Sequence, residues 1–222
     1  MSNSSREAML AAVKINGDAL MTCTNVKLRN DKEIVMESVK TGRDALLWAS
    51  DNMRKDVDVL FEAVTYNGRA LRYAIGLRDH KKIVLQAVKQ DGNALQFASN
   101  ELRSNIEICK AAVFQTPFAI QYCSESIQNN YDIVLHAVQH NGTVIRCASK
   151  ELQSNLDIAF AACNNNIKAF PYIGKSIQKE IEMKLNNCIT NFDIIEISLN
   201  PAPLLLDDFT LFFDIIEIAE EE

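Results

Sequence analysis

The sequence contains little glycine and little proline, 7 and 4 residues in a chain of 222. An all-β domain of this length needs a turn about every ten residues and builds it largely from these two residue types, so their scarcity argues against a sandwich or a barrel. No stretch approaches the roughly 20 apolar residues of a membrane-spanning helix. The first residues, Met-Ser-Asn-Ser-Ser-Arg-Glu, lack the apolar run of a signal peptide. These absences predict a mainly helical protein of the cytoplasm with no membrane span.

Most of the chain also lacks an excess of charge of one sign. The net charge is −6, but the segment from residue 192 to the end contains nine acidic residues and no Lys or Arg. The rest of the chain carries 23 basic and 20 acidic residues, a net charge of +3. Nonspecific nucleic-acid binding requires a basic stripe, so we expect no nucleic-acid partner.

The six cysteines form no CxxC pair, and several replace Val or Ala in an internal repeat described below. We expect them to be reduced thiols that pack as small apolar residues. A nucleophilic cysteine would need a base and an orienting partner, and the chain has only three histidines. The sequence therefore predicts no catalytic residues, no enzyme activity and no cofactor.

An internal repeat of about 25 residues dominates the sequence. A small apolar residue, here named the anchor, recurs at spacings of 24 to 26 residues: Val13, Val39, Val64, Val88, Val113, Val138, Cys163 and Cys188. The position five before the anchor is usually Ile or Val, with Met183 in the last repeat, and the position one before is usually Ala. These three positions share one face of a helix. Each repeat is therefore predicted to begin with an amphipathic helix of about ten residues that buries this face.

Residues typical of helix ends recur on both sides of this helix. Eight residues before the anchor stands an N-cap candidate: Ser5, Asp31, Asp56, His80, Asn105, Asn130, Asn155 and Glu180, of which His80 and Glu180 are the weakest formers. After the anchor, Asn-Gly pairs such as Asn67-Gly68 predict a helix end at positive φ. Asn-Gly also occurs in β-hairpins, but the flanking helical period favours a turn into a second helix.

Hairpins of such short helices are marginal alone and bury their apolar faces by stacking on the next copy. We therefore predict an all-α fold, a solenoid of about seven to eight 25-residue helical hairpins stacked in one curved rod over residues 1–190. Residues 191–222 are predicted to be an acidic, apolar C-terminal capping segment. The alternative is a sticky segment that binds a partner or a second copy, so we expect a monomer or weak self-association through residues 201–222.

The repeat consensus, Asp-x-Glu-Ile-Val-x-x-Ala-Val-x-x-Asn-Gly-x-Ala-Leu-x-x-Ala-Ser-x-x-Leu-Arg, resembles the family known as domain of unknown function 4116 over about residues 5–190. That family occurs in amoebae, in intracellular bacteria of the Legionella kind and in large viruses, and it has no assigned activity. The resemblance thus implies a helical-repeat fold and a host–microbe setting, but no catalytic residues.

The position nine residues after the anchor is often aromatic and lies beside a polar residue. Large aromatics next to Arg suit a partner-binding surface, and they equally suit packing between successive second helices. Both interpretations stay open for the candidate partner-binding residues Trp48, Arg72, Tyr73, Phe97, Tyr122, Arg146 and Tyr172.

His136 and His140 are four residues apart on a predicted helix, a spacing that can share a metal ion. In other repeats the corresponding positions hold different residues, including Gln90 and Gln115, and no third ligand is near in sequence. We interpret these positions as solvent-exposed and expect no metal.

These observations favour a non-catalytic module that binds an as yet unknown protein partner. One alternative is a secreted effector of an intracellular microbe, delivered into a host cytosol to act on host proteins. Another is a structural spacer or oligomerising scaffold.

Overall fold

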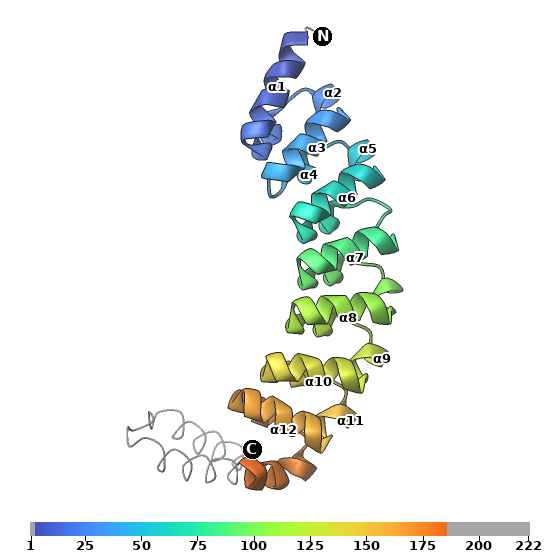
Figure 1. Ribbon diagram of the computed structural model, residues 1–222. Coiled ribbons are helices and arrows are strands. Elements are labelled where there is room, and N and C mark those ends of the chain that lie inside the picture. Colours follow the sequence, from blue (N-terminus) through green and yellow to red (C-terminus); the bar gives the residue numbers. More distant parts are fainter. Residues whose placement is uncertain (1–2, 186–222) are drawn as a thin grey trace, which may run out of the picture. The chain divides into compact units, whose positions relative to one another are not determined.

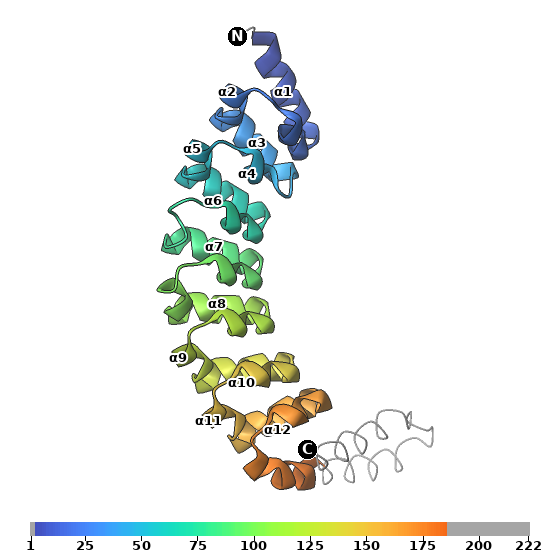
Figure 2. The ribbon, with the colours of Figure 1, turned by 180° about the vertical axis from the view of Figure 1, so that it is seen from behind.

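The computed structural model describes residues 3–185, which contain helices and no strand. The predicted capping segment and the anchor Cys188 lie outside the described residues. The chain divides into two compact units, residues 1–127 and 128–222, and each is described here by itself. The expectation of an all-helical fold with repeated segments is confirmed (Figures 1 and 2).

Each repeat begins with one longer α-helix, generally of ten residues. In the first unit these helices are α1 (Asn3–Ile15), α3 (Lys32–Thr41), α6 (Val57–Tyr66), α7 (Lys81–Gln90) and α8 (Ile106–Gln115). In the second unit they are α10 (Tyr131–His140) and α12 (Leu156–Asn165). Within the first unit they pack in chain order, α1 on α3, α3 on α6, α6 on α7 and α7 on α8, and α10 packs on α12 in the second.

The anchor residues form the centre of the core of each unit. Every anchor from Val13 to Cys163 is buried, and so are the Ile and Val residues five positions before the anchor from Ile34 to Ile158. The first and last repeats depart from this pattern. Ala8 is exposed, and Met183, predicted to be in the core, is 60% exposed while Ile181 and Leu185 are buried. The helical residues 178–185 thus present a different face from the one predicted.

The predicted N-caps are confirmed wherever an Asp or Asn precedes the helix. Asp31, for example, accepts hydrogen bonds from the backbone amides of Glu33 and Ile34, and the side chains of Asp56, Asn105, Asn130 and Asn155 cap their helices likewise. His80 precedes α7 without a side-chain cap bond. The predictions for Ser5 and Glu180 are wrong, because both residues lie inside helical segments.

The second helix of the predicted hairpin is replaced in most repeats by a six-residue 3₁₀ helix. These are η1 (Gly17–Thr22), η2 (Gly68–Tyr73), η3 (Gly92–Phe97), η5 (Pro117–Tyr122), η6 (Gly142–Cys147) and η7 (Ile167–Tyr172). The second repeat has the short α4 (Ala45–Trp48) instead. In η2 and just after it, Gly68, Leu71 and Ala74 are all buried. Their spacing of three residues matches the three residues per turn of a 3₁₀ helix, which is why the chain winds more tightly here.

A short helical turn completes most repeats. These turns are α2 (Val26–Arg29), α5 (Asp51–Arg54), η4 (Leu102–Ser104), α9 (Glu125–Gln128), α11 (Lys150–Gln153) and η8 (Lys175–Ile177). The third repeat is one residue shorter and closes instead with a loop, in which Gly76 has a φ of +70°.

The Asn-Gly pairs do not use positive φ, contrary to the prediction. Asn67 is extended, with a φ of −143°, and its side chain caps η2 by accepting a hydrogen bond from the amide of Arg69. Glycine is required next to it because a Cβ on Gly68 would lie 2.3 Å from the carbonyl oxygen of Ala87 in the following repeat. The glycine therefore permits a close approach between repeats.

Candidate partner-binding surface

Backbone hydrogen bonds join the ends of the later 3₁₀ helices, from η2 on, to the preceding repeat. In the first unit the amide of Ser99 donates to the carbonyl of Arg78, and the amide of Ser124 donates to that of Arg103, both at 2.9 Å. In the second unit the amide of Gly174 donates to the carbonyl of Gln153 at 2.8 Å. The residues at the ends of these 3₁₀ helices are thereby held at a set spacing.

Side-chain amides join the beginnings of η2, η3 and η6 to the following repeat. The Gln90 side chain accepts from the amide of Gly68 at 2.6 Å and donates to the carbonyl of Tyr66 at 3.2 Å. Gln115 and Asn165 accept in the same way from the amides of Gly92 and Gly142. Gln90 and Gln115 are exposed, as predicted, but their side-chain amides also join successive repeats.

The fifth repeat has no backbone amide for such a side chain to bind, and a histidine follows it at the position that Gln90 and Gln115 occupy in other repeats. It begins its 3₁₀ helix with Pro117, which has no N–H to donate, and the next repeat carries His140 where the fourth, fifth and seventh repeats carry Gln or Asn. The ring Nδ1 of His140 lies 2.9 Å from the backbone oxygen of His136 in its own helix. Among residues 3–185, no group of three His, Cys, Asp or Glu side chains could hold a metal ion.

The candidate aromatic residues, here named the aromatic column, are Trp48, Tyr73, Phe97 and Tyr122 in the first unit and Tyr172 in the second. The four in the first unit are half-buried, and Tyr172 is 42% exposed. Each member therefore packs against the repeat and still presents part of its surface to solvent. This partial burial is compatible both with a packing role and with partner binding.

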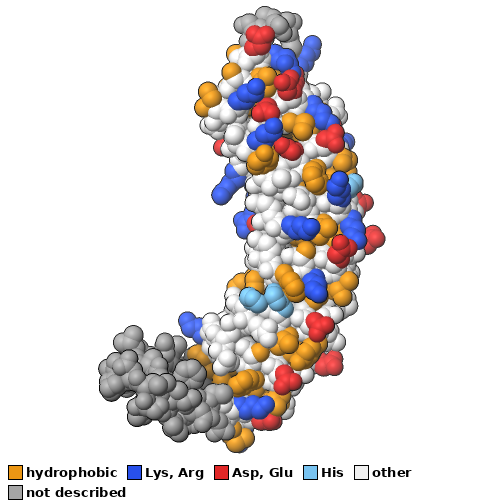
Figure 3. Space-filling model, in the orientation of Figure 1, with side chains coloured by type: hydrophobic (Ala, Val, Ile, Leu, Met, Phe, Trp, Pro, Cys, Tyr) orange, Lys and Arg blue, Asp and Glu red, His pale blue; other side chains and the backbone are white. Residues whose placement is uncertain are grey.

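The polar neighbours of the column point into solvent. Position eight after the anchor holds exposed residues of different character in successive repeats: Met21, Leu47, Arg72, Gln96, Gln121 and Arg146. Elsewhere the exposed apolar residues are scattered, and on the face shown in Figure 3 they are interspersed with charged side chains. That face offers no broad apolar patch of the kind that marks many interfaces.

Arg72 and Tyr73 form a charged cluster with Asp44 of the preceding repeat. The Arg72 guanidinium lies over the Tyr73 ring, 4.5 Å from its centroid, and its Nη2 is 3.0 Å from Asp44 Oδ1. The Tyr73 hydroxyl donates to the same oxygen at 3.0 Å. Hydrogen bonding to Tyr73 raises the pKa of Arg72, and burial raises the pKa of the Tyr73 hydroxyl, so Arg72 stays charged and Tyr73 stays neutral at neutral pH.

Two pockets open among the elements that carry the column. The first, of about 560 Å³, lies in the first unit and is lined by Arg43, Asp44, Asn67, Arg69, Arg72, Gln90 and Asp91. Here the protein supplies counter-charges, because Asp44 pairs with Arg72 and Asp91 pairs with Arg69 at 2.7 Å. The charges of this pocket are largely satisfied from within.

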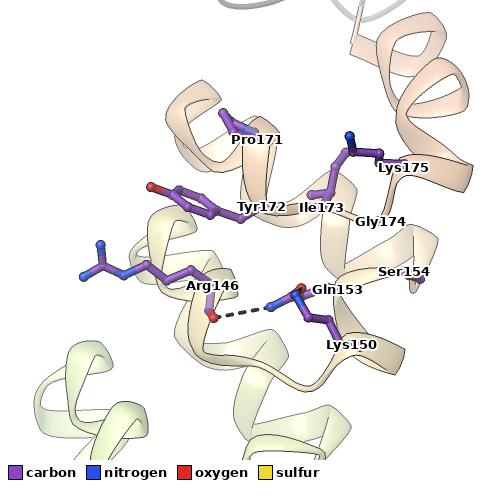
Figure 4. A pocket seen from close by; sticks show the side chains of 9 residues that line it. All are labelled: Arg146, Lys150, Gln153, Ser154, Pro171, Tyr172, Ile173, Gly174 and Lys175. Atoms are coloured by element: carbon purple, nitrogen blue, oxygen red, sulfur yellow. Dashed lines mark hydrogen bonds between the residues drawn. The ribbon is translucent and has the colours of Figure 1, made fainter. Parts of the chain in front are cut away.

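The second pocket, here named the basic pocket, lies in the second unit and has a volume of about 370 Å³. It is lined by Arg146, Lys150, Gln153, Ser154, Pro171, Tyr172, Ile173, Gly174 and Lys175 (Figure 4). It brings together two of the candidate residues, Arg146 and Tyr172, from successive repeats. The lysines at 150 and 175 were missed by the sequence reasoning, since nothing in the repeat pattern marks positions outside the column.

The cysteines of the described residues are free thiols. Cys23, Cys109, Cys123 and Cys163 are buried, as expected for small apolar residues. Burial raises the pKa of Cys163 to about 12, and a hydrogen bond to Cys109 raises the pKa of Cys123. Cys123 and Cys163 are thus protonated at neutral pH.

Within residues 3–185, no helix combines the length and the apolar character needed to cross a lipid bilayer. Comparisons with curated proteins and with solved structures found no match. The model of one family, described as Domain of unknown function (DUF4116), matches residues 5–54, 31–75, 80–128 and 130–178. These matches cover most of the chain and follow the repeats seen in the structure. The chain therefore belongs to the DUF4116 family.

Proposed function

We propose that this protein is a non-catalytic interaction module that binds a partner protein through the aromatic column and its exposed neighbours. We infer that its repeats form a solenoid, because the anchor recurs at spacings of 24 to 26 residues from the first repeat to the seventh. The observation that carries the proposal is the half-burial of Tyr73 and Phe97 on 3₁₀ helices that are hydrogen-bonded to neighbouring repeats at both ends.

Such fixation lowers the entropic cost of binding. An aromatic residue that is already held in place loses little freedom when a partner covers it, and aromatic residues with neighbouring arginines are frequent among the side chains that dominate interface energies. The half-buried rings of Trp48 and Phe97 supply the anchored part of such a surface.

The exposed neighbours supply selectivity. Leu47, Arg72 and Gln121 occupy equivalent places in three repeats, yet they are apolar, cationic and neutral polar. A partner that covers several repeats would meet a specific order of these groups, which favours one partner over others. The reduced cysteines suit a cytosolic compartment, and we place the interaction there.

The test uses exposed column neighbours, whose replacement leaves the core intact. Full-length tagged protein is used to capture partners from the native cell, and the captured proteins are identified by mass spectrometry. We expect Leu47→Glu combined with Gln121→Arg to abolish capture of the specific partner without changing the melting temperature. Lys89→Glu is the control, because Lys89 is exposed on α7 and is not one of the column neighbours. Equal capture by the double variant, the control and the wild type would refute this surface.

A further inference from the structure

Two buried cysteines of the first unit have their thiols next to each other. Cys109 lies on α8 and Cys123 directly follows η5, and the two thiols are hydrogen-bonded to each other. The carbonyl oxygen of Arg103 connects their surroundings. It accepts from Cys109 Sγ at 3.1 Å and from the backbone amide of Ser124, the residue after Cys123, at 2.9 Å. The two sulfur atoms are therefore held together by contacts from both elements.

A comparison of repeat positions sets this pair apart. Cys109 stands four residues before its anchor, and Cys123 stands ten residues after it. In the second, third, fourth and sixth repeats these two positions hold an aliphatic residue and an alanine, namely Val35 and Ala49, Leu60 and Ala74, Val84 and Ala98, and Val134 and Ala148. Of the seven repeats with anchors from Val13 to Cys163, the fifth alone has cysteine at both positions. Because Val with Ala already satisfies the packing, the joint presence of two thiols suggests chemistry in addition to packing.

The surroundings favour reaction at Cys109. The hydrogen bond from Cys123 lowers the pKa of Cys109, and the positive charge of Arg103 lowers it too, whereas burial acts in the opposite direction. The same hydrogen bond raises the pKa of Cys123. Cys109 is therefore the thiol of the pair that loses its proton more readily, and the thiolate is the form that attacks an oxidant.

The 3₁₀ helix beside the pair has one fixing bond fewer than its equivalents. It begins at Pro117, which cannot donate the amide hydrogen bond that Gly68, Gly92 and Gly142 give to the following repeat. Thr116 precedes it without a side-chain cap bond. We therefore expect η5 to open locally more readily than η2, η3 or η6, and such opening admits a small oxidant to the buried thiols.

We propose that Cys109 and Cys123 are a reversible modification site, which forms a disulfide bond in response to hydrogen peroxide. The Cys109 thiolate attacks one peroxide oxygen, the O–O bond breaks, and a sulfenic acid and hydroxide form. The sulfur of Cys123 then attacks the sulfur of Cys109, the S–O bond breaks, and the Cys123 proton leaves with the hydroxyl group as water. The first hydroxide takes up the proton that Cys109 lost. In total the two thiols lose two electrons and two protons, and one peroxide becomes two water molecules.

The disulfide joins α8 to the residue that follows Tyr122, and so it constrains one member of the aromatic column. Disulfides in a reducing compartment are usually transient and redox-sensing, which suits a bond that forms on oxidation and is later reduced. This inference concerns the response of the protein to an oxidant and does not depend on the proposed partner.

The experiment treats full-length protein, first reduced and then freed of reductant, with hydrogen peroxide under native conditions. The remaining thiols are alkylated, and unreduced tryptic peptides are analysed by mass spectrometry. Trypsin cleaves after Lys110, so the disulfide appears as peptide 104–110 joined to peptide 111–146, each of which has one cysteine. We expect this joined product after peroxide, and we expect dithiothreitol to convert it back to two free thiols.

Two variants give the fifth repeat the residues of the sixth and are expected to fold: Cys109→Val and Cys123→Ala. Neither can form the disulfide. In Cys123→Ala the sulfenic acid of Cys109 should persist and react with dimedone, whereas Cys109→Val should give no dimedone adduct at Cys123. If one variant does not fold, the other still tests the assignment. Cys163→Val is the matched control, because it removes a buried thiol from an anchor position and should form the disulfide as the wild type does.

Cys163 also provides the reference for reactivity, because burial raises its pKa to about 12. We expect peroxide to oxidise Cys109 at least about tenfold faster than Cys163. Equal rates at these two residues would overturn the proposal. So would peroxide treatment that oxidises the half-buried Cys147 but leaves Cys109 and Cys123 as free thiols. Oxidation of Cys109 that dithiothreitol does not reverse would overturn it as well, since it would indicate a sulfinic acid in place of a disulfide.

Discussion

The backbone amide of Gly68 donates a hydrogen bond of 2.6 Å to the side-chain oxygen of Gln90, which belongs to the next repeat. The same side chain donates in turn to the carbonyl of Tyr66. One residue thus satisfies two backbone groups at the turn between α6 and η2. Gly68 is buried, so water is poorly placed to replace this partner.

We predict that Gln90→Leu lowers the free energy of unfolding by about 1–3 kcal/mol, the usual cost of leaving a buried polar group without a partner. The measurement is urea denaturation followed by circular dichroism. Gln90→Glu keeps an acceptor for the Gly68 amide and is expected to lose less. Lys89→Leu adds an apolar side chain at the adjacent exposed position and is the control, and a loss as large as that of Gln90→Leu would contradict the proposed role.

Two glycines are predicted to respond differently to alanine. A Cβ on Gly142 would lie 2.1 Å from the carbonyl oxygen of Ala162, so Gly142→Ala must push two repeats apart and should cost about 1–3 kcal/mol or more. Gly76 has positive φ but nothing within 4 Å of an added Cβ, so Gly76→Ala should cost only the backbone strain, about 1 kcal/mol. Thermal denaturation of both variants tests the order. A larger loss for Gly76→Ala would show that close contact is not what requires glycine at position 142.

Two phenylalanines test how much the aromatic column contributes to the stability of the fold. Phe97 is half-buried, and Phe114 on α8 is 48% exposed. We expect Phe97→Ala to destabilise the protein by about 1–2 kcal/mol through lost apolar burial and Phe114→Ala to change stability by about 0.5 kcal/mol or less. Urea midpoints of the two variants provide the comparison. Equal midpoints would mean that the column contributes little to packing, which would shift its role towards binding alone.

The contact between Arg6 and Asp31 predicts a pH dependence of stability. The hydrogen bond from Arg6, with Nε 2.7 Å from Asp31 Oδ2, lowers the pKa of Asp31 below its usual 3.8, and the backbone amide of Ile34 lowers it further. Because the folded pKa is depressed, the stabilisation is complete above the unfolded pKa and is lost as the pH falls below about 4 towards the folded pKa.

Replacing the cation should therefore reduce this acid sensitivity. We expect Arg6→Met to be less stable than the wild type at pH 7 and to differ from it less at pH 2–3, measured as the free energy of unfolding across this range. Lys27→Met removes a cation from an exposed position of the first unit and should leave the pH profile unchanged. A difference between Arg6→Met and the wild type that is constant with pH would contradict the assignment to Asp31.

Much of the fold could be predicted from the sequence, because the determining interactions lie within one turn of helix. Asp31 and Asn105 cap helices two or three residues away, and the buried face of each long helix repeats at a fixed offset from its anchor. The predictions failed at the ends of the repeat array. At Ser5 and Met183 the local pattern did not decide the helix start or the buried face.

Only part of the candidate site could be predicted from the sequence. The column residues Tyr73 and Tyr172 were found from their position in the repeat, but their environments differ. An acid five residues after one anchor meets Tyr73, whereas Thr143 holds the corresponding place before Tyr172. Lys150 and Lys175 come from different repeats, and only their common pocket makes them part of one site.

The amino-acid sequence by itself determined the helical repeat, its period, its caps and the valine core, since each depends on contacts between residues close in the chain. Only the tertiary structure decided that the glycine of the second element serves close approach and that glutamine joins one repeat to the next. Those features depend on atoms about 22 to 25 residues apart, such as Gly68 and Gln90, whose distance is set by how tightly one repeat packs on another.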